Sequence, residues 1–107
     1  MKTEWNNKKS KELFQAVLKL RTLDEAKKFF RDLLTEEEII EFSKRWQAAQ
    51  MLNDSVPYSQ IEKSTGLSST TVARVSKWLN SGTGGYKLII KRTHHRRDKS
   101  LSGKALR

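Results

Sequence analysis

The first half of the chain carries apolar residues every three or four positions, a spacing that predicts amphipathic α-helices. The first of these helices covers residues 9–20 and follows a polar leader, residues 1–8, which we expect to be flexible. The residues on its apolar face are Leu13, Phe14, Val17, Leu18 and Leu20.

A second helix is predicted from residue 23 to residue 33. Thr22 stands three residues before Glu25, the spacing of a capping box, in which the threonine oxygen accepts a backbone amide and the glutamate reaches back. The helix begins after this box. Its spacing places four apolar residues on the buried side: Ala26, Phe29, Phe30 and Leu33.

A third helix follows the same kind of signal. Thr35 and Glu38 form another capping box inside an acidic run, near the positive end of the helix dipole. Capping is sufficient to account for these carboxylates, so we do not interpret them as a catalytic pair. The helix runs to about residue 52, before Pro57. Its expected core residues are Ile39, Phe42, Trp46 and Ala49, with Met51 or Leu52.

Residues 58–79 contain two short helical patterns joined at Gly66. A helix that ends in a left-handed backbone favours glycine, which has no Cβ to clash, and Ser68 can cap the second helix. Four apolar residues fall where two helices and their support must touch: Ile61, Leu67, Val72 and Val75. This spacing predicts a helix-turn-helix, although Glu62 occupies a position where compact versions usually have a small residue.

The second helix of this pattern begins with short polar side chains. An ordinary helical hairpin would satisfy the apolar spacing but would not require this polar start. A recognition helix presents its first turns to the edges of DNA bases, where hydroxyl groups can approach closely and cations can reach phosphate or guanine. The residues that we expect to contact DNA on this basis are Ser68, Ser69, Thr70, Thr71, Arg74 and Lys77.

Beyond this second helix the chain is less regular. Residues 80–85 are rich in glycine and predict a turn; the run Gly82-Thr83-Gly84 is too short, and lacks the preceding strand, for a dinucleotide-binding loop. Residues 86–92 favour a strand by propensity but have no partner strand. We therefore expect a short helix there that covers the core or docks on a second subunit.

Charge is distributed unevenly along the chain. Residues 1–55 hold 11 Lys/Arg and 10 Asp/Glu, whereas residues 56–107 hold 11 and 2, so most of the net charge of +10 lies in the second half. A basic half that carries a helix-turn-helix pattern is typical of a surface that binds nucleic acid. Residues 93–107 are expected to form a disordered basic arm, in which His94 and His95 lack the partners of a metal site.

Length and composition limit the chain to one domain with a small core. The chain has 107 residues with 36% hydrophobic content, and we predict a single helical domain over residues 9–92. A small core with apolar stripes on most helices often completes its burial by dimerisation. The absence of cysteine excludes disulfides and thiolate metal sites. Because no apolar run approaches the ~20 residues of a membrane span and no signal peptide is recognisable, we expect a soluble protein of the cytoplasm.

Several motifs in the chain are shared with a known family: Leu34-Thr35, Lys44-Arg45, Ser59-Gln60, Thr65-Gly66 and the run from Thr71 to Arg74. In these motifs the chain resembles the Trp repressor superfamily, and especially its short repressor-like relatives of unassigned function. The resemblance implies an all-α, intertwined homodimer that binds double-stranded DNA. It adds Gln60 and Lys63 near phosphates, and Ala73 facing bases together with Ser69 and Thr70.

Tryptophan-responsive members of that family bind their corepressor through a threonine and two arginines, and Thr35, Arg45 and Arg74 match these positions. The next position in those members is a glycine that leaves room for the indole. Here it is Val75, whose branched side chain is expected on the inner side of the helix, where it would fill that space. The resemblance keeps open a site for L-tryptophan or another small effector, while Val75 favours a protein without a cofactor.

Together these patterns predict a DNA-binding transcriptional regulator, a repressor in the simplest case, that reads a near-palindrome as a dimer and catalyses no reaction. A ligand-gated repressor is one alternative. Another is the DNA-targeting head of a transposition or replication system, or an RNA-binding module. An enzyme is disfavoured, because no nucleophile and base stand at a suitable spacing and both histidines lie in the basic arm.

Overall fold

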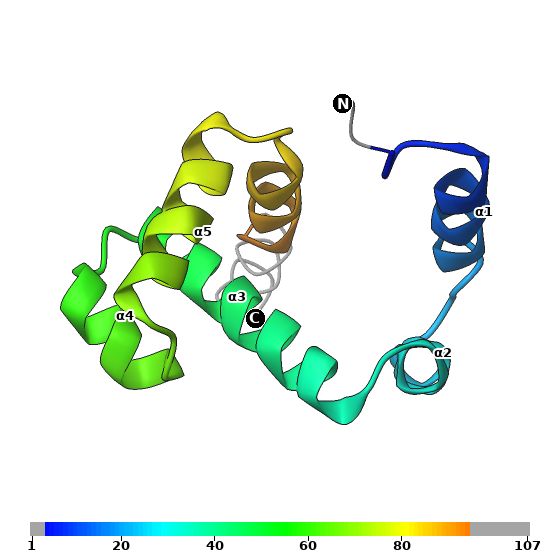
Figure 1. Cartoon of the computed structure of the whole chain (residues 1–107), viewed down its shortest axis with the longest axis horizontal. Coiled ribbons are helices and arrows are strands. Elements are labelled where there is room, and N and C mark those ends of the chain that lie inside the picture. Colours follow the sequence, from blue (N-terminus) through cyan, green and yellow to red (C-terminus); the bar gives the residue numbers. More distant parts are fainter. Residues whose placement is uncertain (1–3, 95–107) are drawn as a thin grey trace, which may run out of the picture. The chain divides into compact units, whose positions relative to one another are not determined.

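A computed structural model describes residues 4–94 of the protein, which consist of helices connected by short turns (Figure 1) and contain no strand. The predicted all-α class is confirmed. The chain divides into two compact units, residues 1–39 and 40–107, so that α3 begins in the first unit and continues in the second. The helices are α1 (Lys8–Val17), α2 (Leu23–Leu33), α3 (Glu36–Asn53), α4 (Tyr58–Thr65) and α5 (Ser69–Ser81), followed by a helical segment at residues 85–94.

The capping box predicted before α3 is present, and the box predicted before α2 is formed in part. The backbone N–H of Glu25 donates to Thr22 Oγ1 at 3.1 Å, and Glu25 Oε1 accepts at 2.8 Å from the N–H of Arg21, one residue before the expected donor. At α3, the N–H of Glu38 donates to Thr35 Oγ1 at 3.0 Å and the N–H of Thr35 donates to Glu38 Oε1 at 2.9 Å. Because these bonds satisfy amides that lack intrahelical partners, both helices begin where the sequence predicted.

α1 begins with a cap that the sequence analysis missed, and it is shorter than predicted. Asn7 Oδ1 accepts from the N–H of Ser10 at 3.0 Å, and Ser10 Oγ accepts from the N–H of Asn7 at 2.9 Å. The helix ends at Val17, because the N–H of Leu20 donates to the carbonyl of Val17, three residues back, and tightens the chain into a turn. Because the apolar spacing continues through this turn, the predicted helix extended three residues too far. Residues 1–3 of the expected leader lie outside the described residues.

The apolar faces predicted for the first two helices are not buried in the single chain. α1 and α2 contain no buried residue, and Leu33 and Leu18 are 46% and 83% exposed. Phe14 is 52% exposed although Trp5 packs edge-to-face on it, with 6.3 Å between the ring centroids. Phe42, predicted on the core side of α3, is 46% exposed. The burial predicted for Leu33 and Phe42 is therefore wrong for the single chain, whereas the other three residues predicted to be buried on α2 are half-buried. Periodicity identifies a shared face but not the element that covers it.

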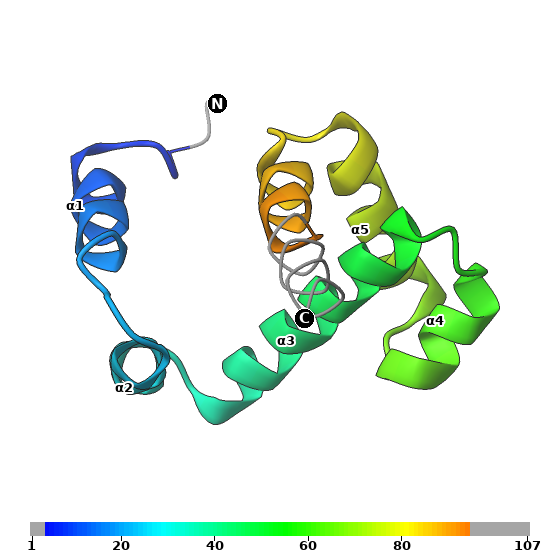
Figure 2. The same cartoon turned by 180° about the vertical axis from the view of Figure 1, so that it is seen from behind.

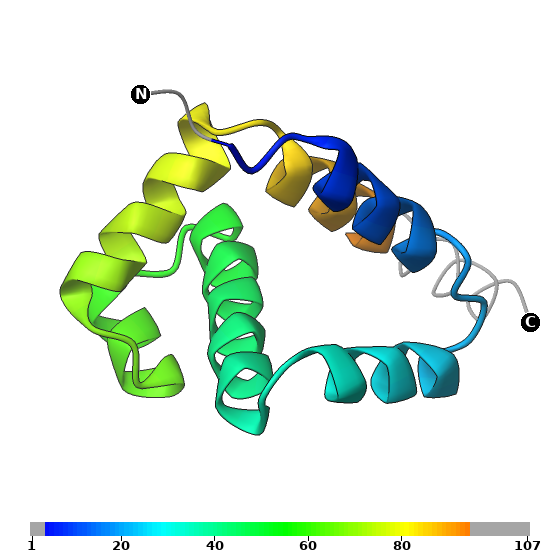
Figure 3. The ribbon, with the colours of Figure 1, turned by 45° about the vertical axis from the view of Figure 1, so that its right-hand side comes forward.

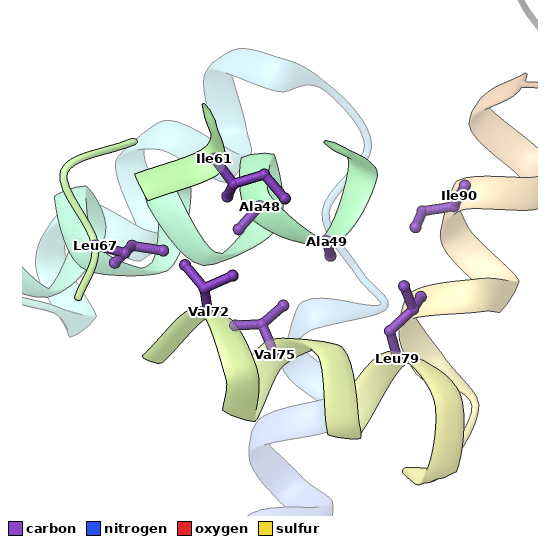
Figure 4. Packing of buried hydrophobic residues seen from close by; sticks show 8 residues of the cluster. All are labelled: Ala48, Ala49, Ile61, Leu67, Val72, Val75, Leu79 and Ile90. Atoms are coloured by element: carbon purple, nitrogen blue, oxygen red, sulfur yellow. The ribbon is translucent and has the colours of Figure 1, made fainter. Parts of the chain in front are cut away.

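The hydrophobic core of the described chain lies in the second unit (Figure 4). Val72 and Val75 point from α5 toward Ala48 of α3 and Ile61 of α4 in that view. The apolar set predicted around Gly66 is therefore confirmed, whereas Ala48 was missed because an alanine contributes little to an apolar pattern. The buried apolar residues are Ala48, Ala49, Ile61, Leu67, Val72, Val75, Leu79 and Ile90.

Residues 85–94 turn back beside α3 and α5 (Figure 2) and complete this core. Ile90 is only 3% exposed, and Tyr86 stacks on Trp46 with 6.2 Å between ring centroids and 25° between ring planes. The helical interpretation of this segment is confirmed over the strand, because a lone strand would leave its backbone groups unpaired. Of the predicted basic arm, residues 95–107 lie outside the described residues.

Candidate nucleic-acid interface

The turn from which α4 and α5 diverge (Figure 3) depends on the backbone at Gly66. Gly66 has a φ of 79°, in the left-handed region, and its N–H donates to Glu62 O at 2.8 Å. Thr65 is buried, and its Oγ1 donates to Ile61 O at 2.7 Å and accepts from the N–H of Leu67 at 3.1 Å. The threonine therefore stabilises both sides of the turn, and the predicted role of the glycine is confirmed.

Ser68 caps α5 as predicted, and its side chain is exposed. Its Oγ accepts from the N–H of Thr71 at 3.1 Å and lies 3.1 Å from Thr71 Oγ1, to which it donates. Ser69 and Thr70, between these two residues, are exposed. The start of α5 thus presents short hydroxyl side chains at the positive end of the helix dipole, where an anion is favoured.

The two sides of α5 have opposite character. Val72, Val75 and Leu79 are at most 5% exposed and face the core. Residues three or four positions apart lie on the same side of a helix, and a second set with this spacing lies opposite the buried one. All of the residues on that side are exposed, and α5 contains no acidic residue. We refer to this surface as the α5 outer face, and it comprises Ser69, Thr70, Ala73, Arg74 and Lys77.

The remaining candidates for DNA contact lie on α4 and at the turn. Gln60 and Lys63 are exposed on α4, whereas Thr71 is half-buried. Lys44 of α3 was not a candidate, yet its ammonium reaches this region: a Cβ placed on Gly66 would lie 3.8 Å from Lys44 Nζ. α3 therefore adds a positive charge beside the turn between α4 and α5. No local spacing could indicate this contact, since the two residues are 22 positions apart.

The residues matched to corepressor contacts have different surroundings. Thr35 belongs to the first unit, where its side chain caps α3. Arg74 is exposed on the α5 outer face, and Arg45 is half-buried in the second unit. Val75, directly after Arg74, is completely buried, so the expectation that it fills space on the inner side of α5 is confirmed.

The half-buried Arg45 guanidinium lies near groups from two helices. Its Nε lies 3.5 Å from Glu41 Oε2, one turn earlier on α3, and is buried without a hydrogen bond within the described residues. Its Cζ lies 5.7 Å from the ring centroid of Phe42 and 6.0 Å from that of Trp78 on α5. Burial raises the pKa of Tyr86, while the charge of Arg45 acts against this rise. The site therefore holds a cation between one carboxylate and aromatic rings.

Other kinds of site have little support in the part of the chain that the structure describes. Between residues 4 and 94, no group of three or more histidine, cysteine, aspartate or glutamate side chains could hold a metal ion. No helix in the same range is long and apolar enough to span a bilayer.

An open, mostly apolar hollow adjoins the Arg45 site, because the two share Trp78. The residues that line it are Trp78, Gly82, Thr83, Gly85, Tyr86 and Ile89.

The described chain is helical, and α4 and α5 form a two-helix unit with an exposed, cationic outer face, which we call the head. Comparison with known proteins identifies the family. Residues 8–94 match the family model described as Trp repressor protein, and the chain therefore belongs to the Trp repressor family. The resemblance drawn from the motifs is confirmed.

Individual relatives agree with this assignment. The chain is 36% identical over 91 residues to the uncharacterized protein YerC of Bacillus subtilis (strain 168), covering 85% of this chain and 88% of YerC. The crystal structure of a TrpR-like protein from Eubacterium eligens ATCC 27750 matches with a TM-score of 0.80 and 39% identity, over 84% of this chain and 93% of that one. A provisionally named Trp repressor from Staphylococcus aureus matches with a TM-score of 0.75 and 38% identity, over 78% and 84% of the two chains.

Proposed function

We propose that this protein is a sequence-specific DNA-binding transcriptional regulator, a repressor that reads a near-palindromic operator as a homodimer through a helix-turn-helix formed by α4 and α5. The observation that carries the proposal is the contrast between the two sides of α5. One side is buried in the core, while the outer face is exposed, polar and cationic. Membership of the Trp repressor family supports a DNA-binding regulator over an enzyme.

In this proposal the α5 outer face enters the major groove. Ser69, Thr70 and Ala73 approach the base edges, because short side chains allow the helix backbone to come close. Arg74 and Lys77 supply phosphate or guanine contacts, and the exposed polar residues of α4 contact phosphates. Few of these side chains can make paired hydrogen bonds to one base, so bound water and DNA shape contribute part of the specificity.

Dimerisation is part of the proposal because the first unit exposes its apolar side chains. Leu18, Leu23 and Phe14 are 83%, 73% and 52% exposed, although they lie on or beside helices that begin with a side-chain cap. A second copy of the chain would cover these side chains. Two copies related by symmetry would present two α5 helices about 34 Å apart, one helical turn of DNA.

Selection of bound DNA from a random pool, followed by affinity measurements across a salt series, tests the proposal. We expect one near-palindromic site and an affinity that falls steeply with salt, because bound cations displace condensed counterions. Arg74→Ala should lower the slope of log affinity against log salt by about 1 if Arg74 neutralises a phosphate. Lys27→Ala, which removes an exposed cation from α2, should leave the slope unchanged. An affinity that is flat in salt and shows no preferred sequence would disprove the proposal.

A tryptophan-gated repressor is a second candidate, favoured by the match of Arg45 and Arg74 to the corepressor arginines. Calorimetry with L-tryptophan tests it. Gating would be established by two results. Tryptophan should release or absorb heat on binding the wild type but not Arg74→Ala, and the wild type should bind DNA more tightly when tryptophan is present. The complete burial of Val75 opposes this candidate. A DNA-targeting head of a transposition or replication system would differ from both by lacking a single defined operator.

A further inference from the structure

The Arg45 site connects two helices on which the proposed DNA reading depends. Arg45 belongs to α3, whereas Trp78 belongs to α5, between the buried residues Val75 and Leu79. The 6.0 Å approach of the guanidinium to the indole therefore ties the second half of α5 to α3 at the edge of the core. Neither Arg45 nor Trp78 belongs to the α5 outer face, so this contact is separate from the side chains proposed to touch DNA.

The chain itself supplies Arg45 with the two groups that a bound aromatic amino acid would bring. Glu41 places a carboxylate oxygen 3.5 Å from Nε, and Trp78 places an indole over the guanidinium. The side chains of Arg45 and Glu41 are only 37% and 40% exposed, so solvent screens their attraction in part rather than completely. On the same helix, Val75 is completely buried in the core.

We propose that Arg45 and Trp78 are positioning residues that hold α5 in its DNA-reading orientation without a free effector, with the Trp78 indole and the Glu41 carboxylate in the place of a ligand. This inference rests on the proposed function and specifies its regulation. DNA binding then depends on the amount of the protein and on salt, and does not depend on the concentration of a free amino acid.

Loss of the contact should lower the population of binding-competent heads. A head without it samples other orientations of α5, and only the competent fraction binds DNA, so the apparent affinity falls by that fraction. For a half-buried guanidinium over an aromatic ring, the expected change is roughly 3- to 30-fold. The number of phosphate contacts in the bound state stays the same. The salt slope should therefore remain that of the wild type, which separates a positioning residue from a contact residue.

The test compares the full-length wild type, Trp78→Ala and Trp78→Phe on the selected operator across a salt series. Trp78→Ala should bind roughly 3- to 30-fold more weakly with an unchanged salt slope, while Trp78→Phe should retain most of the affinity because a ring remains. Added free indole should restore part of the affinity of Trp78→Ala and leave the wild type unchanged. Trp5→Ala removes another exposed indole, 58% exposed on the first unit, and indole should not alter its DNA binding.

Arg45→Met provides an independent variant should Trp78→Ala fail to fold. The methionine keeps an apolar stem of similar length and removes the charge, so it should show a comparable loss of affinity with no response to indole. Arg45→Lys should recover part of the loss, because the cation is restored. Circular dichroism before binding establishes that each variant is folded.

Three results would overturn the positioning role: unchanged affinity in both Trp78→Ala and Arg45→Met, a reduced salt slope in Trp78→Ala, or tighter binding of the wild type in the presence of L-tryptophan. The two proposals fail in different ways. If the wild type selects no operator, the proposed function fails. If the wild type selects one and both variants bind it equally well, only the positioning role fails.

Discussion

The two units of the chain have equally well-formed helices and very different burial. In the first unit, residues 1–39, α1 and α2 each begin with a side-chain cap and neither contains a buried residue. The second unit, residues 40–107, contains every buried apolar residue found between residues 4 and 94. Caps determine where helices begin in both units, whereas burial requires another element to cover the apolar face.

This difference shows that one amphipathic pattern can serve two purposes. In the second unit, the turn at Gly66 brings α5 back against earlier helices, so Ile61 and Val72 become buried within one chain. In the first unit, Phe14 and Leu33 remain exposed and available to a second copy. Stability that comes from contacts within one chain should not change with protein concentration. Stability that comes from contacts between two copies should rise with protein concentration.

Ile61→Ala should produce the largest effect. The side chain is completely buried, so its truncation leaves a cavity and should cost about 2–5 kcal/mol of unfolding free energy. Denaturant unfolding at two protein concentrations measures the loss, which should be the same at both. Leu18→Ala, at an 83% exposed residue of the first unit, should cost less than about 1 kcal/mol in dilute protein. Similar losses in the two variants would remove the contrast between the units.

Leu33→Lys should act on assembly rather than on the fold of one chain. Leu33 is 46% exposed at the end of α2, where a lysine suits the helix dipole, but an unpaired charge would be buried in the proposed dimer. The dimer dissociation constant should rise at least roughly tenfold, or about 1.4 kcal/mol. Sedimentation equilibrium measures this rise, with Lys27→Ala on the same helix as the control. A wild type that stays monomeric at concentrations where it binds DNA would contradict the prediction.

Thr35→Ala should have an intermediate effect, with a cause that can be identified. The threonine oxygen accepts from the N–H of Glu38 at 3.0 Å, and loss of such a cap costs about 1 kcal/mol. Thermal unfolding should show the same loss with and without L-tryptophan, and Thr35→Ser should restore most of the stability. A loss that appears only in the presence of tryptophan would instead assign Thr35 to a ligand site.

Lys28→Ala should have the smallest effect. Lys28 Nζ lies 3.1 Å from Asp24 Oδ2, but the two side chains are 76% and 74% exposed, so water and salt weaken their attraction. The unfolding free energy should change by less than about 0.5 kcal/mol, and the change should shrink further in high salt. A larger loss would mean that the first unit depends on its surface charges more than on the covering of its apolar faces.

The correct sequence predictions concern contacts between residues close together in the chain. The boxes at Thr22 and Thr35 located the starts of α2 and α3, because a cap acts over three or four residues. Gly66 located the turn for the same reason, since its left-handed backbone is a local requirement. The exposure of Arg74 and Lys77 follows from the helical period once the inner side of α5 is known. Their roles in DNA binding remain predictions.

Apart from the two ends of α1, the errors concern what lies beside a helix rather than the helix itself. Phe42 was expected in the core but is 46% exposed, whereas Ala48 is completely buried. Periodicity ranked the larger side chain as the better core residue. Small alanines on α3 instead allow the valines of α5 to approach closely, so the contact surface contains Ala48 and Ala49.

Local sequence alone determined that the described chain is helical, where α2, α3 and α5 begin, and that α5 has one apolar and one polar side. Hydrogen bonds and steric limits within about four residues are sufficient for each of these features. Only the tertiary structure decided which apolar faces are covered within one chain and that Arg45 meets Trp78, 33 positions later. Such a contact depends on how helices fold back on one another, and the packing of the whole second unit sets that geometry.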